Sequence, residues 1–81
     1  MKFYEKLRQE RKKIGITQKS LGDKLNVSAQ TIAGWENESS FPKIENLVAL
    51  SEIFCVTTDY LLKDELLEPG RTIADGMTTL V

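Results

Sequence analysis

The sequence predicts an all-α fold: a compact five-helix domain followed by a short C-terminal tail. Through most of the first 67 positions, apolar residues recur three and four residues apart, which places them on one face of a helix. Residues that favour helix N-caps stand at the start of successive segments, and Gly, Asn or Pro stands where several of them end. No stretch before residue 70 alternates apolar and polar residues for long enough to indicate a strand.

The first helix is expected from Phe3 to about Gly15. Phe3, Leu7 and Ile14 fall on or near one face of this helix, and lysine and arginine fill the other faces. Glycine at the end of the segment can adopt the left-handed backbone of a helix C-cap. We therefore expect an amphipathic helix that buries its apolar face.

Two short helices follow, and a tight turn joins them. Thr17 and Ser28 are good N-caps for the second and third helices, and Asn26 between them tolerates a left-handed backbone. Gly22 leaves room for close helix approach. The side chains expected to bury the inner faces are Leu21, Leu25, Val27, Ile32 and Trp35. This order of residues describes a helix-turn-helix.

The loop-like run of residues 37–42 ends the third helix, because Pro42 biases Phe41 toward an extended backbone. A fourth helix is predicted from a broad apolar stripe, whose members are Ile44, Leu47, Val48, Leu50, Ser51 and Phe54. Thr57 or Thr58 can cap a fifth helix that stops before Pro69. The helical domain is therefore assigned to residues 1–67.

Residues 68–81 form a tail of different character, rich in threonine and β-branched residues and centred on Asp75-Gly76. Asp-Gly is a strong signal for a two-residue hairpin. An isolated hairpin is marginal in water. The tail is therefore expected either to fray or to act as a dimerisation or partner segment that packs on the helices or pairs with another chain.

Composition excludes several classes of function. No apolar run approaches the ~18 residues of a membrane span, and the N-terminus lacks the apolar stretch of a signal peptide, so we expect a cytoplasmic protein without a membrane partner. The chain has no histidine, which argues against a Ser-His-Asp triad and the usual zinc sites. We expect no enzyme, metal or cofactor, and we interpret Cys55 as a small, partly buried residue.

Charge is uneven along the chain. Residues 1–43 hold nine basic and five acidic residues, a net charge of +4, whereas residues 44–81 hold two basic and seven acidic residues, a net charge of −5. A polyanion would therefore meet the N-terminal half. Because the net charge of the whole chain is only −1, an unevenly charged solvated surface is the preferred interpretation of this pattern taken alone.

Residues 3–67 resemble the Cro/phage-repressor type of helix-turn-helix, also called the xenobiotic-response-element family. The resemblance rests on Leu7, Arg11, Gly15-Ile16-Thr17-Gln18, Leu21, Leu25, Val27-Ser28, Thr31-Ile32, Trp35-Glu36-Asn37, Pro42, Glu45-Asn46-Leu47 and Asp59-Tyr60-Leu61-Leu62. It implies a five-helix domain whose third helix, about residues 28–36, enters the major groove of double-stranded DNA, usually as a homodimer on a two-fold symmetric operator. It also implies an ion pair between Arg11 and Glu36.

The resemblance implies two sets of contacts with DNA. The residues expected to face bases are Ala29, Gln30, Thr31, Ala33 and Gly34. The residues expected to contact phosphates are Arg11, Gln18, Ser28, Asn37, Ser39, Ser40 and Lys43. Among the base-facing residues Gln30 is the best candidate for direct readout, because a glutamine can bond adenine N6 and N7 together. A/T-containing half-sites would follow.

This chain departs from the family pattern at several positions. Many relatives carry a long polar side chain where it has Ala29 and Gly34, so few groups can bond a base edge. Glu10 stands where an apolar residue is usual, with Ile14 expected to fill the gap, and Glu38 and Cys55 stand where glycine is frequent.

The sequence predicts a DNA-binding transcriptional regulator of the repressor type. The alternative is a protein-interaction module, such as an antitoxin-like subunit.

Overall fold

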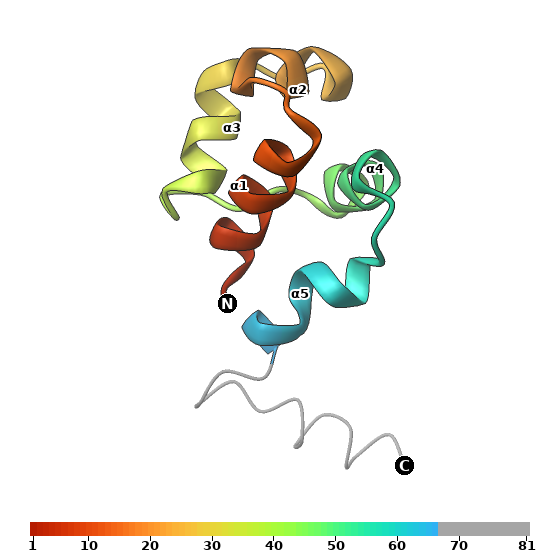
Figure 1. Ribbon diagram of the computed structural model, residues 1–81. Helices are drawn as coiled ribbons and strands as arrows, with labels where there is room; N and C mark the ends of the chain where they lie inside the picture. The colour runs from red at the N-terminus through yellow and green to blue at the C-terminus, as the bar shows by residue number, and fades with distance from the viewer. Residues whose placement is uncertain (67–81) are drawn as a thin grey trace, which may run out of the picture.

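The computed structural model describes residues 1–66, with side chains described through residue 63. Five helices follow one another (Figure 1): α1 Phe3–Ile14, α2 Gln18–Leu25, α3 Ala29–Glu36, α4 Ile44–Phe54 and α5 Thr58–Leu66. The described residues contain no strand, and none of their helices is long and apolar enough to cross a membrane. The predicted all-α, five-helix class is confirmed. The tail of residues 68–81 and its hairpin lie outside the described residues and stay predictions.

The helix ends fall at the residues whose chemistry suits them. Thr17, Ser28 and Thr57 cap α2, α3 and α5, since each side-chain oxygen accepts a hydrogen bond of 2.9–3.0 Å from the backbone N–H three residues further on. Gly15 and Asn26 end α1 and α2 with left-handed backbones, at φ 77° and 62°. The caps predicted at these positions are confirmed.

Cys55 ends α4 in the same left-handed conformation, with φ 57°. Its side chain is exposed, so the prediction of a partly buried residue was wrong. The reason is its place in the helix cap, one residue past the last turn that packs on the core. Glu38, in the loop after α3, has φ 70°. Both positions are therefore ones where glycine would be less strained.

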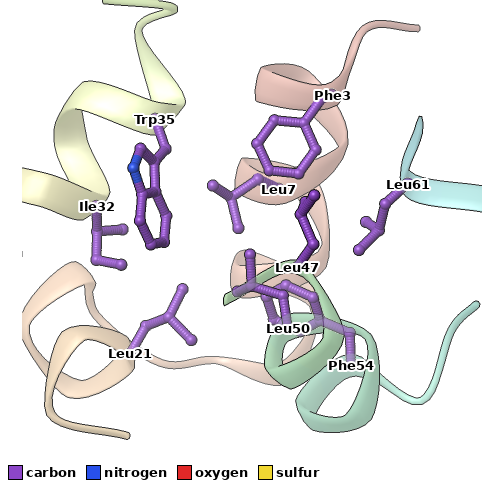
Figure 2. Packing of buried hydrophobic residues seen from close by; sticks show 9 residues of the cluster. All are labelled: Phe3, Leu7, Leu21, Ile32, Trp35, Leu47, Leu50, Phe54 and Leu61. Carbon is purple, nitrogen blue, oxygen red and sulfur yellow. The ribbon is translucent and has the colours of Figure 1, made fainter. Parts of the chain in front are cut away.

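The hydrophobic core draws on all five helices. Its buried apolar side chains are Phe3, Leu7, Leu21, Ile32, Trp35, Leu47, Leu50, Phe54 and Leu61. Figure 2 shows these side chains pointing toward one another, with Leu7 of α1 near the middle of the group. Trp35 is only 3% exposed, which confirms its predicted place in the core.

Close packing between α2 and the turn that follows it depends on a missing side chain. A Cβ atom at Gly22 would lie 2.6 Å from the backbone oxygen of Val27. A Cβ atom and a non-bonded backbone oxygen repel each other strongly at this distance, so the turn can pack this closely on α2 because residue 22 is glycine. The predicted close approach at Gly22 is confirmed.

Three residues assigned to apolar faces are exposed instead: Ile14 at 45%, Ile44 at 76% and Val48 at 44%. Leu47, Leu50 and Phe54 form the buried stripe of α4, and Ile44 and Val48 lie at the edge of that stripe at 100° per residue. Ile14 lies in the last turn of α1. The predictions for these three residues were wrong, because periodicity gives the direction of a face but not how far its neighbours cover it.

Glu10 stands on α1 where the family usually has an apolar residue, and Ile14 was expected to fill the resulting gap. Its side chain is buried, and its Oε2 accepts hydrogen bonds from the Tyr60 hydroxyl and the Lys13 Nζ, both at 3.3 Å. Lys6, also buried, donates from Nζ to the Tyr60 backbone oxygen at 2.6 Å and lies 4.9 Å from the centre of the Tyr60 ring. Polar contacts therefore run along the α1–α5 interface, in addition to buried Leu61.

Candidate nucleic-acid interface

The α2–α3 pair forms a helix-turn-helix, with residues 26–28 as the turn (Figure 1). On α3, Ile32, Trp35 and Glu36 are buried. Successive residues of a helix are 100° apart around its axis, so Gln30, Ala33 and Gly34 lie on the side of α3 away from these buried residues. The recognition face predicted from the sequence is therefore directed away from the domain's own core.

The predicted base-contacting residues differ in what they can offer a base. Gln30 is exposed, whereas the other four residues are partly exposed: Ala29, Thr31, Ala33 and Gly34. The Thr31 hydroxyl forms a hydrogen bond with the Ser28 hydroxyl, and the two oxygens lie 2.9 Å apart. Gln30 therefore supplies the one amide side chain on this face, next to small and apolar groups.

Gly34 lies under the loop that follows α3. A Cβ atom at this position would lie 2.9 Å from the Ser40 hydroxyl and 3.3 Å from the Ser39 hydroxyl. The Gly34 carbonyl accepts hydrogen bonds from the Ser39 N–H at 3.0 Å and the Ser40 N–H at 3.2 Å. The close approach that requires a glycine here is therefore made by the protein's own loop.

Several predicted phosphate contacts already have structural roles. Asn37 Oδ1 accepts a hydrogen bond from the Ser39 N–H at 2.9 Å, and the Ser39 hydroxyl donates to the Gly34 oxygen at 3.3 Å. Ser28 caps α3. Ser40 and Lys43 are exposed, and Lys43 stands at the N-cap of α4 without a side-chain cap bond. The loop is therefore ordered by its own polar groups, with the Lys43 ammonium at its end.

Arg11, Gln18 and Glu36 meet where three helices end or begin. Arg11 Nε donates to Glu36 Oε2 at 2.7 Å, and Arg11 Nη2 donates to Glu36 Oε1 at 3.1 Å. Gln18 Nε2 also donates to Glu36 Oε1, at 3.1 Å, and Arg11 Nη1 donates to the Ile16 oxygen at 2.9 Å. The expected Arg11–Glu36 ion pair is confirmed, and Glu36, with a side chain only 4% exposed, is well satisfied.

The sequence did not predict the bond between Gln18 and Glu36. Gln18 was assigned to a phosphate and Glu36 to Arg11, and residue spacing does not tell how near the start of α2 lies to the end of α3. One signal for this bond was available in the sequence: Glu36 ends a helix that packs on the core, and a buried carboxylate needs several hydrogen-bond donors. Gln18 is half-buried, and its amide nitrogen contacts Glu36.

The helix-turn-helix family model matches residues 7–61 of this chain. The match covers more than half of the chain and includes all five helices in whole or in part. The chain therefore belongs to the helix-turn-helix family, of the Cro and phage-repressor type.

Relatives with assigned roles are transcription regulators. The chain is 44% identical to repressor protein C2 of Salmonella phage P22 over 76% of this chain and 29% of the relative. It is 42% identical to the transcriptional activator BcrR of Enterococcus faecalis over 80% and 32% of the two chains, and 36% identical to the regulator ImmR of Bacillus subtilis over 89% and 58%. The chain thus spans 29–58% of the length of these relatives.

Solved structures give the same family. A crystal structure of the P22 c2 repressor in complex with a synthetic operator matches with a TM-score of 0.74 and 41% identity, covering 78% of this chain and 96% of the other. The solution structure of the same repressor's DNA-binding domain matches with a TM-score of 0.72, covering 78% and 83%. At this identity the two chains share their fold and the placement of their helices.

Proposed function

We propose that this protein is a sequence-specific, non-catalytic DNA-binding regulator of transcription that acts as a repressor. The observation that carries the proposal is the outward face of α3, where Gln30 is exposed and Ala29 and Ala33 are partly exposed. An α-helix fits the major groove of B-DNA, where each base pair presents a distinct pattern of donors and acceptors. The similarity to a repressor solved with its operator supports the same use of this face.

Base recognition in this proposal is narrow. Gln30 would bond adenine N6 and N7, while the methyl groups of Ala29, Thr31 and Ala33 can pack on a thymine methyl. Gly34 has no side chain to offer a base, and Ser39 and Ser40 lie against it. Half-sites containing A·T pairs follow from this set of groups.

Phosphate contacts would position the domain on the duplex. The proposed residues are Arg11, Gln18, Ser28, Asn37, Ser39, Ser40 and Lys43. The net charge of +4 over residues 1–43 supports an approach of this half to a polyanion. Since genomic DNA is the partner, we place the action of the protein in the cytoplasm.

A homodimer on an inverted repeat is the arrangement we propose. Two copies of α3 would lie in successive major grooves about one helical turn, ~34 Å, apart. Occupancy of the operator by the dimer would exclude other proteins and so repress transcription. A role of residues 68–81 in such pairing stays a prediction from the sequence, since these residues lie outside the described ones.

The antitoxin-like alternative loses part of its support. It drew on Ala29 and Gly34 as residues unsuited to base contact, but Gly34 has a structural explanation in its approach to Ser39 and Ser40. No other described feature favours that alternative.

Selection of bound duplexes from a random pool tests the proposal. We expect enrichment of a two-fold symmetric sequence with A·T pairs in each half-site. Affinity for that duplex should fall steeply as salt rises from about 50 to 200 mM, because bound lysine and arginine release counterions from the phosphates. Failure to enrich any sequence, together with no detectable binding at about 50 mM salt, would refute the proposal.

A further inference from the structure

In the cluster of Arg11, Gln18 and Glu36, the side chain of Gln18 donates a hydrogen bond to the Glu36 carboxylate. Arg11 stands in the last turn of α1, Gln18 is the first residue of α2, and Glu36 is the last residue of α3. We infer that Glu36 is a positioning residue for DNA binding: its carboxylate holds the Gln18 side chain so that an amide N–H faces a DNA phosphate. This inference rests on the proposed function, because it requires a duplex at the start of α2.

The chemistry of the two side chains fixes the orientation of the amide. An ionised carboxylate only accepts hydrogen bonds, so Gln18 must turn Nε2, not Oε1, toward Glu36. Nε2 carries two hydrogens, and the bond of 3.1 Å to Glu36 Oε1 uses one of them. The second N–H is thus available for another acceptor. A phosphate also only accepts hydrogen bonds, so an unrestrained amide would present its oxygen part of the time and repel the phosphate.

The negative charge of Glu36 does not prevent a phosphate from approaching the Gln18 amide. Arg11 neutralises the carboxylate through two hydrogen bonds of 2.7 and 3.1 Å, and the Glu36 side chain is 4% exposed. Arg11 itself uses three of its five N–H groups on Glu36 and Ile16, which leaves two donors on a guanidinium that is 12% exposed. A phosphate near Gln18 would therefore meet a neutral pair with N–H groups at its surface.

The position of Glu36 on α3 adds a second consequence. Because the carboxylate belongs to the helix that carries Gln30, the direction of the Gln18 amide depends on where α3 sits relative to α2. The phosphate contact and the base contact are then parts of one rigid arrangement. Loss of Glu36 should weaken the phosphate contact even though Glu36 itself never touches DNA.

A double-mutant cycle on the full chain tests this inference with the selected duplex. In the wild-type background, Gln18→Ala should lower affinity roughly tenfold, the scale of a hydrogen bond to a charged group. In a Glu36→Ala background the same change should cost less than about twofold, because the amide is no longer directed. Equal factors in the two backgrounds would overturn the inference, since a merely structural role of Glu36 leaves the effect of Gln18→Ala unchanged.

Glu38→Ala is the matched control. Glu38 is an exposed acid two residues beyond Glu36, so its removal changes the charge in the same way without touching Gln18. The factor for Gln18→Ala should keep its wild-type value in this background. All variants are compared at a temperature where far-UV circular dichroism shows them to be folded.

A spectroscopic measurement on the wild-type protein keeps the test decisive if Glu36→Ala does not fold. The two Nε2 protons of Gln18, assigned by comparison with Gln18→Ala, give separate signals in a ¹⁵N-edited NMR spectrum. On addition of the duplex, the proton bonded to Glu36 should keep its shift while the other proton moves downfield. A change in the chemical shift of the proton bonded to Glu36 would show that Gln18 leaves Glu36 to reach DNA, which contradicts the inference.

The outcomes separate this inference from the proposed function. If no duplex binds, the regulator proposal fails and the inference falls with it. If the duplex binds and Gln30→Ala weakens it while Gln18→Ala does not, the regulator proposal stands and the role of Glu36 is refuted.

Discussion

The Ser40 hydroxyl lies over the Gly34 backbone, where a Cβ atom on residue 34 would come within 2.9 Å of it. We expect Gly34→Ala alone to change the free energy of unfolding by less than about 0.5 kcal/mol, because the gain in helix propensity of about 1 kcal/mol is offset by this contact. In a Ser40→Ala background most of that gain should appear, since the obstructing oxygen is gone. Urea denaturation of the two single variants and the double variant measures the coupling. Additive effects would contradict the contact.

Gly22→Ala should be much more harmful. The added methyl would meet the backbone oxygen of Val27 at 2.6 Å, and a backbone atom cannot rotate away as a hydroxyl can. We expect a loss of about 2 kcal/mol in the free energy of unfolding. Gly15→Ala is the matched control: nothing lies within 4 Å of its Cβ position, so its cost of about 1 kcal/mol should come from the left-handed backbone alone. A milder effect at residue 22 than at residue 15 would refute this account.

Two non-glycine residues hold left-handed backbones that glycine would adopt more easily. Glu38→Gly and Cys55→Gly should each raise the free energy of unfolding by about 0.5–1 kcal/mol, since φ is 70° and 57° at these positions. Asn26→Gly, at φ 62°, should gain less, because asparagine tolerates this region. The midpoints of thermal unfolding rank the three variants. Destabilisation by Glu38→Gly would mean that its side chain makes a favourable contact in the loop.

The Tyr60 hydroxyl donates to the buried carboxylate of Glu10 at 3.3 Å. Tyr60→Phe should lower the free energy of unfolding by about 1 kcal/mol, because it removes one of the two hydrogen-bond donors to the buried Glu10 carboxylate while the ring stays in place. Tyr4→Phe, on the same helix as Glu10 but outside this contact, serves as the control. Equal stability of Tyr60→Phe and the wild type would show that Lys13 and water satisfy Glu10.

Gln30 and Lys43 should differ in the kind of DNA binding that each supports. Gln30→Ala should relax the preference at one base pair, with a loss of about 1–3 kcal/mol of discrimination. Lys43→Ala should weaken binding to all duplexes alike and reduce the slope of log affinity against log salt by about one. Titrations of the selected duplex and of its single-base variants distinguish the two effects. A uniform loss for Gln30→Ala would argue against direct readout.

Local chemistry allowed much of this fold to be predicted from sequence. The caps at Thr17 and Ser28, the left-handed Asn26 and the close approach at Gly22 all follow from properties of single residues in their immediate neighbourhood. The Arg11–Glu36 pair followed from the family resemblance. These features need no knowledge of the distant parts of the chain.

Features that depend on tertiary coverage could not be predicted in the same way. Ile44 and Val48 fit an apolar stripe, yet only the geometry of α1, α2 and α5 around α4 decides that they stay exposed. Glu10 required its partner Tyr60, fifty residues further along the chain, to become an acceptable buried acid. The bond from Gln18 to Glu36 likewise depends on how two helix ends meet, which spacing does not encode.

The connections between helices have a consequence for folding kinetics. Only residues 15–17, 26–28 and 55–57 join α1 to α2, α2 to α3 and α4 to α5, so most neighbours in space are near neighbours in sequence. Helical domains with such local contacts fold within microseconds to milliseconds, because little chain entropy is lost before contacts form. A newly made or transiently opened copy of this domain should therefore regain its shape far faster than a ribosome adds one residue, at roughly 5–20 residues per second.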